Sequence, residues 1–291
     1  MPSDPPAPEV AEMVRHSAEH LSPKQAEIAT RMYDIYYDKH PDWMRLWSAD
    51  FRKKKPSTES GGKQITLMAK VQAQVMFHAM KSVAQVERIS GDLNRVSQKH
   101  VSRNIQPEMY PDLGVALVQA IAEIEPSTDP KVLDAWSQCY TYITTLFIDM
   151  EKTMYEEAKE RKNGFIGFRE FKIASKVQVK LEQSGSDTED EEDLMPDNTV
   201  IEFIPIDGAG LPSYTPNQYV CVRVDTPKLG GITHRNYTLY GDSNEKSFKL
   251  SLNKMDCSIV TEALLDELKI GDVIQMSAPF GQFLLMETLV D

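Results

Sequence analysis

The stretch that decides the fold reads Lys99-His100-Val101-Ser102-Arg103-Asn104-Ile105-Gln106-Pro107-Glu108-Met109-Tyr110-Pro111. A helix that carries His100 near its end has to stop before Pro107, because proline lacks an amide hydrogen and clashes with the preceding turn. A new helix can begin at Pro111, since proline is favoured in a first helical turn. The resulting corner predicts that the His100 imidazole faces the gap between helices. An iron ligand has to lie in such a place, fixed in orientation and facing a dry pocket.

Apolar residues recur every three or four positions on both sides of this corner, which is typical of amphipathic helices. One stripe predicts a helix of roughly 30 residues that begins at Pro130; its members are Val132, Trp136, Tyr140, Ile143, Phe147, Met150 and Met154. Shorter stripes predict helices around residues 28–35, 68–83 and 113–124. We therefore expect an all-α domain over residues 8–161, after a flexible, proline-rich N-terminus at residues 1–7.

The pattern changes at Asn163-Gly164, where segments read as strands and are separated by Gly, Pro, Asn and Asp. The predicted strands cover residues 200–204, 219–224, 248–252 and 272–276. Short strands at this spacing indicate an antiparallel barrel or sandwich, and we expect this second domain to span residues 162–291.

An acidic stretch at residues 183–198 interrupts the second domain. It contains Ser184, Ser186 and Thr188, followed by five acidic residues at 189–193. Like charges at this density repel one another and resist burial, so the stretch predicts a disordered loop. It is either a solvated insertion or a phosphorylation site for an acidophilic kinase.

Composition excludes several classes of protein. A net charge of −12 disfavours nonspecific nucleic-acid binding, which depends on neutralising phosphates. No apolar run is long enough to span a membrane, and the N-terminus lacks the features of a secretory signal. Cys139, Cys221 and Cys257 lie far apart, which argues against a disulfide framework or a thiolate zinc site. We therefore expect a cytoplasmic protein.

The segment around His100 resembles the proximal haem segment of flavohaemoglobins, in which Lys-His is followed by Ile-x-Pro-Glu-x-Tyr. The resemblance implies that His100 ligates the iron of haem b and that Tyr110 hydrogen-bonds close to the imidazole. The family's distal tyrosine stands in a Phe-Tyr-Asp run ahead of a His-Pro turn. Here Met32-Tyr33-Asp34 precedes His40-Pro41, so Tyr33 is the residue expected to donate a hydrogen bond to bound oxygen.

Other pocket positions depart from the family pattern. Trp47 matches a phenylalanine that the family places against the haem. The family's distal glutamine, followed four residues later by leucine, fits two registers here: Gln64 with Met68, or Lys63 with Leu67. We prefer Gln64 with Met68, because an amide can face the ligand without placing a charge in an apolar pocket.

The family's glutamate that pairs with the proximal histidine maps onto Thr153 when positions are counted back from Tyr155. Glu151 lies two residues earlier, roughly 200° around a helix, and is not expected to substitute for it. Without this carboxylate, we expect the histidine to donate less electron density through the iron to bound oxygen.

The second half resembles the FAD-binding barrel of the same family at residues 164–171, 214–219 and 235–238. These segments match its aromatic-Gly-aromatic-Arg-x-Phe, Tyr-x-Pro-Gly-Gln-Tyr and Arg-x-Tyr-Ser patterns. The resemblance implies that Arg235 pairs with the pyrophosphate, Tyr237 covers a ring face and Thr238 bonds a ring nitrogen. A helix opened near Thr261 would receive the phosphates, although Ser258 stands where the family has glycine. The FAD-binding residues implied are Tyr219, Arg235, Asn236, Tyr237, Thr238 and Thr261.

The predicted fold is thus an all-α globin fold followed by an antiparallel β-barrel of the ferredoxin-reductase FAD-binding type. The resemblance covers two of the family's three domains, because the chain has no Gly-x-Gly-x-x-Gly run for NAD. Either the chain is a fragment, or it takes electrons from a separate reductase. NAD(P)H would then act only through a missing domain or that partner.

The resemblance implies a nitric oxide dioxygenase that converts NO and O2 to nitrate, with electrons passed from FAD to haem. The alternative is a gas-binding or redox-sensing haemoprotein that relies on a separate reductase.

Overall fold

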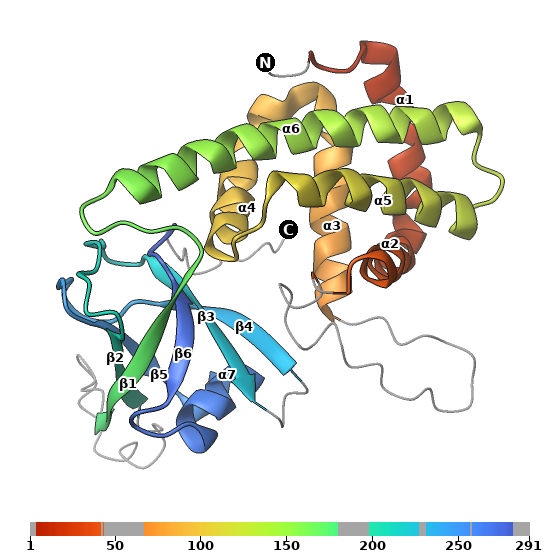
Figure 1. Cartoon of the computed structure of the whole chain (residues 1–291). Helices are drawn as coiled ribbons and strands as arrows, with labels where there is room; N and C mark the ends of the chain where they lie inside the picture. Colours follow the sequence, from red (N-terminus) through yellow and green to blue (C-terminus); the bar gives the residue numbers. More distant parts are fainter. Residues whose placement is uncertain are drawn as a thin grey trace, which may run out of the picture. The chain divides into compact units, whose positions relative to one another are not determined.

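The computed structural model describes residues 4–41, 43, 67–179, 198–226, 231–256 and 258–281. The chain divides into two compact units. One comprises residues 1–100 and 105–154, and the other comprises residues 101–104 and 155–291. The first unit is helical, and the second contains an antiparallel sheet (Figure 1). The change from helices to strands therefore follows the change in sequence pattern near Asn163.

Six α-helices account for most of the helical part (Figure 1): α1 (Pro8–Leu21), α2 (Gln25–Lys39), α3 (Leu67–Lys81), α4 (Ser90–Ser102), α5 (Tyr110–Ile124) and α6 (Pro130–Glu160). The four helices predicted from apolar stripes correspond to α2, α3, α5 and α6. The long stripe is confirmed as a single helix of 31 residues that begins at Pro130.

The predicted corner after His100 is confirmed. Helix α4 ends at Ser102, and Asn104 takes a left-handed conformation with a φ of 60°, which asparagine tolerates better than most residues. The Ile105 amide donates to the His100 carbonyl at 3.0 Å, which closes the end of the helix. A short 3₁₀ helix, Pro107–Met109, then leads directly into α5.

Helices α5 and α6 approach closely at Gly114. A Cβ atom at this position would lie only 2.6 Å from the Tyr140 ring. The Tyr140 hydroxyl donates to the Tyr110 carbonyl at 3.0 Å, which ties the start of α5 to α6. Deeper in this unit, the fully buried Trp136 packs against Phe77 at a ring-centroid distance of 5.3 Å. These contacts fix the two helices that flank His100.

In the described residues of the sheet unit there are six strands: β1 (Phe168–Val179), β2 (Asn198–Pro205), β3 (Tyr219–Thr226), β4 (Gly231–Thr238), β5 (Phe248–Leu252) and β6 (Val273–Ser277). The strands pair antiparallel in the order β4-β3-β6-β1-β2-β5. The four predicted strands are β2, β3, β5 and β6. No pairing joins β4 to β5 among the described residues, so closure into a barrel stays a prediction.

One face of the sheet forms the core of this unit. Its fully inaccessible members include Phe171, Ile173, Ile201, Phe203 and Phe248. The turn that leads into β3 has Asn217 at a φ of 68°. The matching family position is glycine, and both residue types tolerate this left-handed conformation.

The predicted helix near Thr261 is present as α7 (Ile259–Glu262), continued by a π-helical turn at Ala263–Glu267. Ser258 caps it, because its hydroxyl accepts from the Val260 amide at 3.3 Å. The stretch predicted as a disordered acidic loop lies outside the described residues, except for Asn198, which begins β2 and is therefore not part of a loop.

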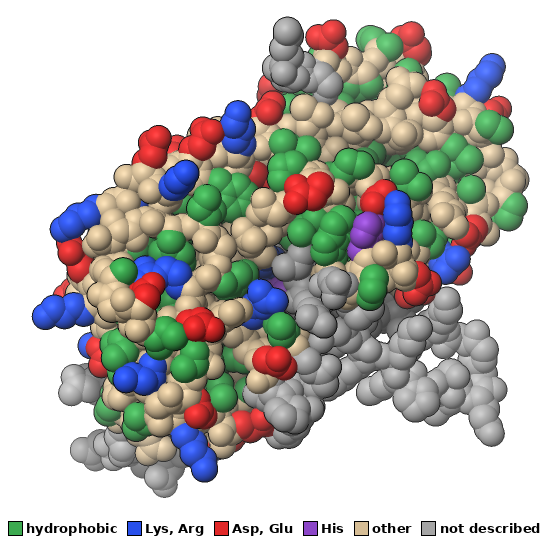
Figure 2. Space-filling view, in the orientation of Figure 1, with side chains coloured by type: hydrophobic (Ala, Val, Ile, Leu, Met, Phe, Trp, Pro, Cys, Tyr) green, Lys and Arg blue, Asp and Glu red, His purple; other side chains and the backbone are tan. Residues whose placement is uncertain are grey.

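Charged side chains of both signs are interspersed over the face of the molecule drawn in Figure 2. In the part of the chain that the structure describes, no helix is both long and apolar enough to cross a bilayer.

Candidate haem and flavin sites

His100 stands near the end of α4 with its side chain 17% exposed. Its Nδ1 atom lies 2.7 Å from the Tyr110 hydroxyl and 2.8 Å from Oε1 of Glu151. The Tyr110 hydroxyl donates to the same Glu151 oxygen at 2.6 Å. Three polar groups from α4, α5 and α6 therefore meet within hydrogen-bond distance of one another.

The hydrogen bonds to Glu151 and Tyr110 determine which nitrogen of the His100 imidazole can bind a metal. An ionised carboxylate only accepts hydrogen bonds, so Nδ1 carries the hydrogen that it shares with Glu151. In a neutral imidazole Nε2 then keeps its lone pair. Nε2 has no hydrogen-bond partner among the described residues. A histidine held through one nitrogen, with a lone pair on the other, fits the requirement for a metal ligand.

The predicted absence of a carboxylate beside His100 is wrong. Thr153 is exposed, and its hydroxyl donates to the Asp149 carbonyl of its own helix at 3.2 Å. Glu151 is 2% exposed and faces His100. The Phe147 ring packs 5.4 Å from the His100 ring, and Glu151 follows Phe147 by four residues on the same helical face. Counting back from Tyr155 leads to Thr153, which is two residues from Glu151 and on the opposite face of α6.

Phe147 contacts His100, although the sequence predicted Phe147 only as a member of the apolar stripe that begins after Pro130. Its ring lies nearly parallel to that of Tyr110, at a centroid distance of 6.3 Å and an angle of 7°. The two rings and His100 are thus packed together, which limits rotation of the imidazole.

Tyr33 lies on α2 and is 8% exposed. Trp47, Gln64 and Lys63 lie outside the described residues. Met68 and Leu67 lie in the first turn of α3, where side chains are not among those described. The choice between the two distal registers therefore stays a prediction.

In the sheet unit, β4 and α7 bring together two predicted flavin residues. The Tyr237 hydroxyl lies 2.9 Å from the Thr261 hydroxyl, and both residues are buried. The Arg235 guanidinium lies 6.0 Å from the centre of the Tyr237 ring. Arg235 and Thr238 are themselves exposed. An exposed cation and an exposed hydroxyl on one strand are groups suited to a phosphate and a ring nitrogen.

Tyr219 and Asn236 lie on the adjacent strands β3 and β4. Tyr219 is 3% exposed and exchanges two backbone hydrogen bonds with Phe280, at 3.0 and 2.9 Å. Its ring covers Gly281, where a Cβ atom would lie 2.8 Å away. The Asn236 amide donates to the Ser102 hydroxyl at 3.1 Å, within the same unit, while its Oδ1 atom is buried with no hydrogen-bond partner.

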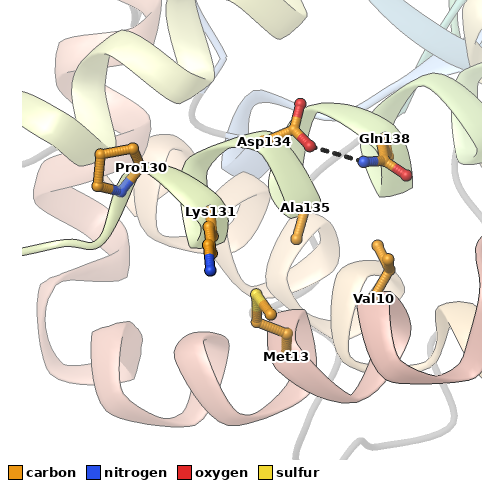
Figure 3. Close-up of a pocket in the computed structure, with 7 residues that line it drawn as sticks. All are labelled: Val10, Met13, Pro130, Lys131, Asp134, Ala135 and Gln138. Carbon is orange, nitrogen blue, oxygen red and sulfur yellow. Dashed lines mark hydrogen bonds between the residues drawn. The ribbon is translucent and has the colours of Figure 1, made fainter.

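A shallow hollow also lies between α1 and the start of α6 (Figure 3), lined by Val10, Met13, Pro130, Lys131, Asp134, Ala135 and Gln138. None of these residues belongs to the His100 cluster. The Gln138 amide donates to Asp134 at 2.7 Å, so the main polar pair is already satisfied within the helix. This hollow therefore contributes nothing to the site.

Sequence comparison agrees with both halves of this description. The globin family model matches residues 30–146. A flavohaemoprotein of Bacillus anthracis is 30% identical over 279 residues, covering 94% of this chain and 63% of that protein. One from Deinococcus radiodurans is 27% identical over 282 residues, covering 97% of this chain and 64% of that protein. The chain is therefore similar in sequence to the flavohaemoproteins over nearly its whole length. It spans about 63% of the length of the relatives that it matches.

Structure comparison supports the same fold. The crystal structure of a flavohaemoglobin from Malassezia yamatoensis, determined with bound FAD and haem, has a TM-score of 0.73 and 18% sequence identity. The match covers 98% of this chain and 67% of that one. This likeness shows a helical globin part followed by an antiparallel β-sheet domain.

Proposed function

We propose that this chain takes part in nitric oxide dioxygenation, the conversion of NO and O2 to nitrate, with haem b in residues 8–161 and FAD in residues 162–291. The observation that carries the proposal is His100, which is held through Nδ1 by Glu151 and Tyr110 while Nε2 has no hydrogen-bond partner among the described residues. The flavohaemoprotein relatives, and the flavohaemoglobin of the same fold with bound FAD and haem, support it.

Haem, when bound, supplies the iron that takes up O2, and FAD supplies the electrons that reduce that iron. His100 is the protein ligand. Glu151 draws the Nδ1 hydrogen toward itself, which makes Nε2 a stronger electron donor. The Tyr110 hydroxyl donates a hydrogen bond to the same carboxylate oxygen and so holds the carboxylate in place. Both groups are buried, so water does not weaken these hydrogen bonds.

Tyr33 would donate the hydrogen bond that orders the oxygen ligand. Gln64 is proposed as a second polar group there, with Trp47 and Met68 as apolar walls. A preorganised donor stabilises charge that develops on the ligand without costly reorganisation.

For the flavin, Arg235 is proposed to pair with the pyrophosphate and Thr238 to bond the ring. Tyr237, Asn236, Tyr219 and Thr261 are proposed to shape the surface that receives the ring. Electrons would come from NAD(P)H through a further domain or a separate reductase.

Reduced, haem-loaded chain under oxygen tests the proposal when it is mixed with NO and nitrate is measured. We expect stoichiometric nitrate, and a Soret band that His100→Ala abolishes. Survival of the oxygen complex in NO without nitrate would refute the activity.

The alternative, a gas-binding or redox-sensing haemoprotein, was favoured in part by Thr153. The buried Glu151 beside His100 removes that support, because a carboxylate that can tune the imidazole is present after all.

A further inference from the structure

Four tyrosines form a buried cluster in the helical unit. Tyr33, Tyr36 and Tyr37 come from α2 and Tyr140 comes from α6, and each is at most 9% exposed. The Tyr37 ring stacks on that of Tyr33 at a centroid distance of 5.6 Å and an angle of 18°. The two residues stand one helical turn apart, so their side chains share a face of α2.

The hydroxyls of this cluster differ in their partners. Tyr36 donates to the Met109 carbonyl at 2.9 Å, and Tyr140 donates to the Tyr110 carbonyl at 3.0 Å. The Tyr37 hydroxyl is buried and has no hydrogen-bond partner among the residues that the structure describes. Buried polar groups are nearly always hydrogen-bonded, because an unpaired one loses its water without compensation.

A phenylalanine at position 37 would keep the stacking and avoid this loss. The hydroxyl therefore calls for a partner other than the described residues, small enough for a buried site and able to accept a hydrogen bond. Burial raises the pKa of Tyr37 well above its usual value near 10, and the neighbouring phenols of Tyr33 and Tyr36 raise it further. The group is thus a neutral phenol that can donate.

We propose that the Tyr37 hydroxyl is a further hydrogen-bond donor of the gas-ligand pocket, acting beside Tyr33 on the bound diatomic molecule or on the water that replaces it. This inference rests on the proposed function, because it takes the Tyr33 side of α2 as the ligand side. It assigns to Tyr37 a role in how long the ligand is held.

The test compares Tyr37→Phe with the matched control Tyr36→Phe, whose hydroxyl is already engaged by a carbonyl. Dissociation of O2 from the reduced, haem-loaded chain is followed by stopped-flow absorbance. We expect Tyr37→Phe to release O2 about fivefold faster, the equivalent of one neutral hydrogen bond of about 1 kcal/mol. Tyr36→Phe should leave the rate unchanged. The carbonyl stretching frequency of the CO complex should shift only in Tyr37→Phe, because that frequency responds to nearby donors.

A second measurement uses the unfolding of the haem-free chain in urea. Since the Tyr37 hydroxyl has no partner in the described part of the chain, Tyr37→Phe should unfold at the same or a higher urea concentration, and Tyr36→Phe at a lower one. Equal destabilisation by both substitutions would overturn the inference, because it would show a partner within the chain. Unchanged O2 release and CO frequency in Tyr37→Phe would also overturn it.

The failure of this inference and that of the proposed function are distinguishable. If haem uptake and nitrate formation are normal but Tyr37→Phe does not change O2 release, only the role of Tyr37 is refuted. A chain that takes up no haem would refute both this role and the proposed function.

Discussion

Replacing Glu151 by glutamine tests how the protein tunes its proposed iron ligand. The substitution keeps the volume of the side chain and removes its charge. Oε1 of Glu151 accepts two hydrogen bonds, from the Tyr110 hydroxyl at 2.6 Å and from Nδ1 of His100 at 2.8 Å. Glutamine can still accept at its amide oxygen, so we expect the cluster to stay assembled.

The magnitude follows from the change in acceptor. A hydrogen bond to a charged group contributes roughly 1.5–3 kcal/mol, and a neutral one about 1 kcal/mol. Two weakened bonds therefore cost the cluster of His100, Tyr110 and Glu151 roughly 1–4 kcal/mol. At about 1.4 kcal/mol for each factor of ten, this corresponds to roughly a 5- to 1,000-fold effect on rates, which includes the range of about 10- to 100-fold typical of losing an outer-shell partner of a metal ligand.

Three readouts follow the effect: the rate at which haem passes to a scavenging apoprotein, the iron–histidine stretching frequency by resonance Raman, and the rate of NO consumption. Thr153→Ala is the matched control, because Thr153 lies two residues away on the same helix but is exposed. We expect the control to behave as the unmodified chain. If Glu151→Gln and Thr153→Ala were indistinguishable in all three readouts, Glu151 would not be the partner of His100.

Three further predictions concern packing and reactivity. Gly114→Ala should destabilise the helical unit by roughly 1–3 kcal/mol in urea unfolding, because the added Cβ collides with the Tyr140 ring; a loss below about 0.5 kcal/mol would contradict this. Tyr237→Phe should cost about 1 kcal/mol by removing the bond to Thr261, and should weaken FAD binding in a fluorescence titration; unaltered values for both would argue against the site. Burial raises the pKa of the Cys221 thiol to about 12, so it should stay protonated and unlabelled by maleimide at pH 8 until the chain unfolds; labelling of folded protein, seen by peptide mass spectrometry, would disprove its burial.

Much of the helical unit could be predicted because its helices carry long apolar stripes with clear ends. Pro130 and the residues from Val132 to Met154 determined α6, and Pro107 determined the corner after His100. Strands β1 and β4 were harder to predict from the sequence. Only Phe171 and Ile173 of β1 are fully buried, and charged residues fill much of the remaining strand, which weakens the alternating signal. In β4, Arg235 and Thr238 are exposed, so the strand does not read as apolar.

The contact between His100 and Tyr110 was predicted correctly, whereas the contact between His100 and Glu151 was not. Sequence spacing fixes a helical face only when the count starts from the right residue, since two positions turn the side chain through roughly 200°. A better signal was present: Glu151 falls between Phe147 and Met154, at a position where the apolar stripe calls for a buried residue. An acidic residue in such a stripe indicates a partner in the core. The sequence did not predict that the Tyr37 hydroxyl would lack a partner among the described residues, because only three-dimensional packing shows which donors are paired.

A haem titration followed by Soret absorbance tests the central claim, that His100 is the iron ligand, most directly. The unmodified chain should take up one equivalent of haem and give a histidine-ligated spectrum. His100→Ala should lose that spectrum, and added imidazole should restore it by filling the vacated position. A His100→Ala chain that bound haem with an unchanged spectrum and without imidazole would contradict the account.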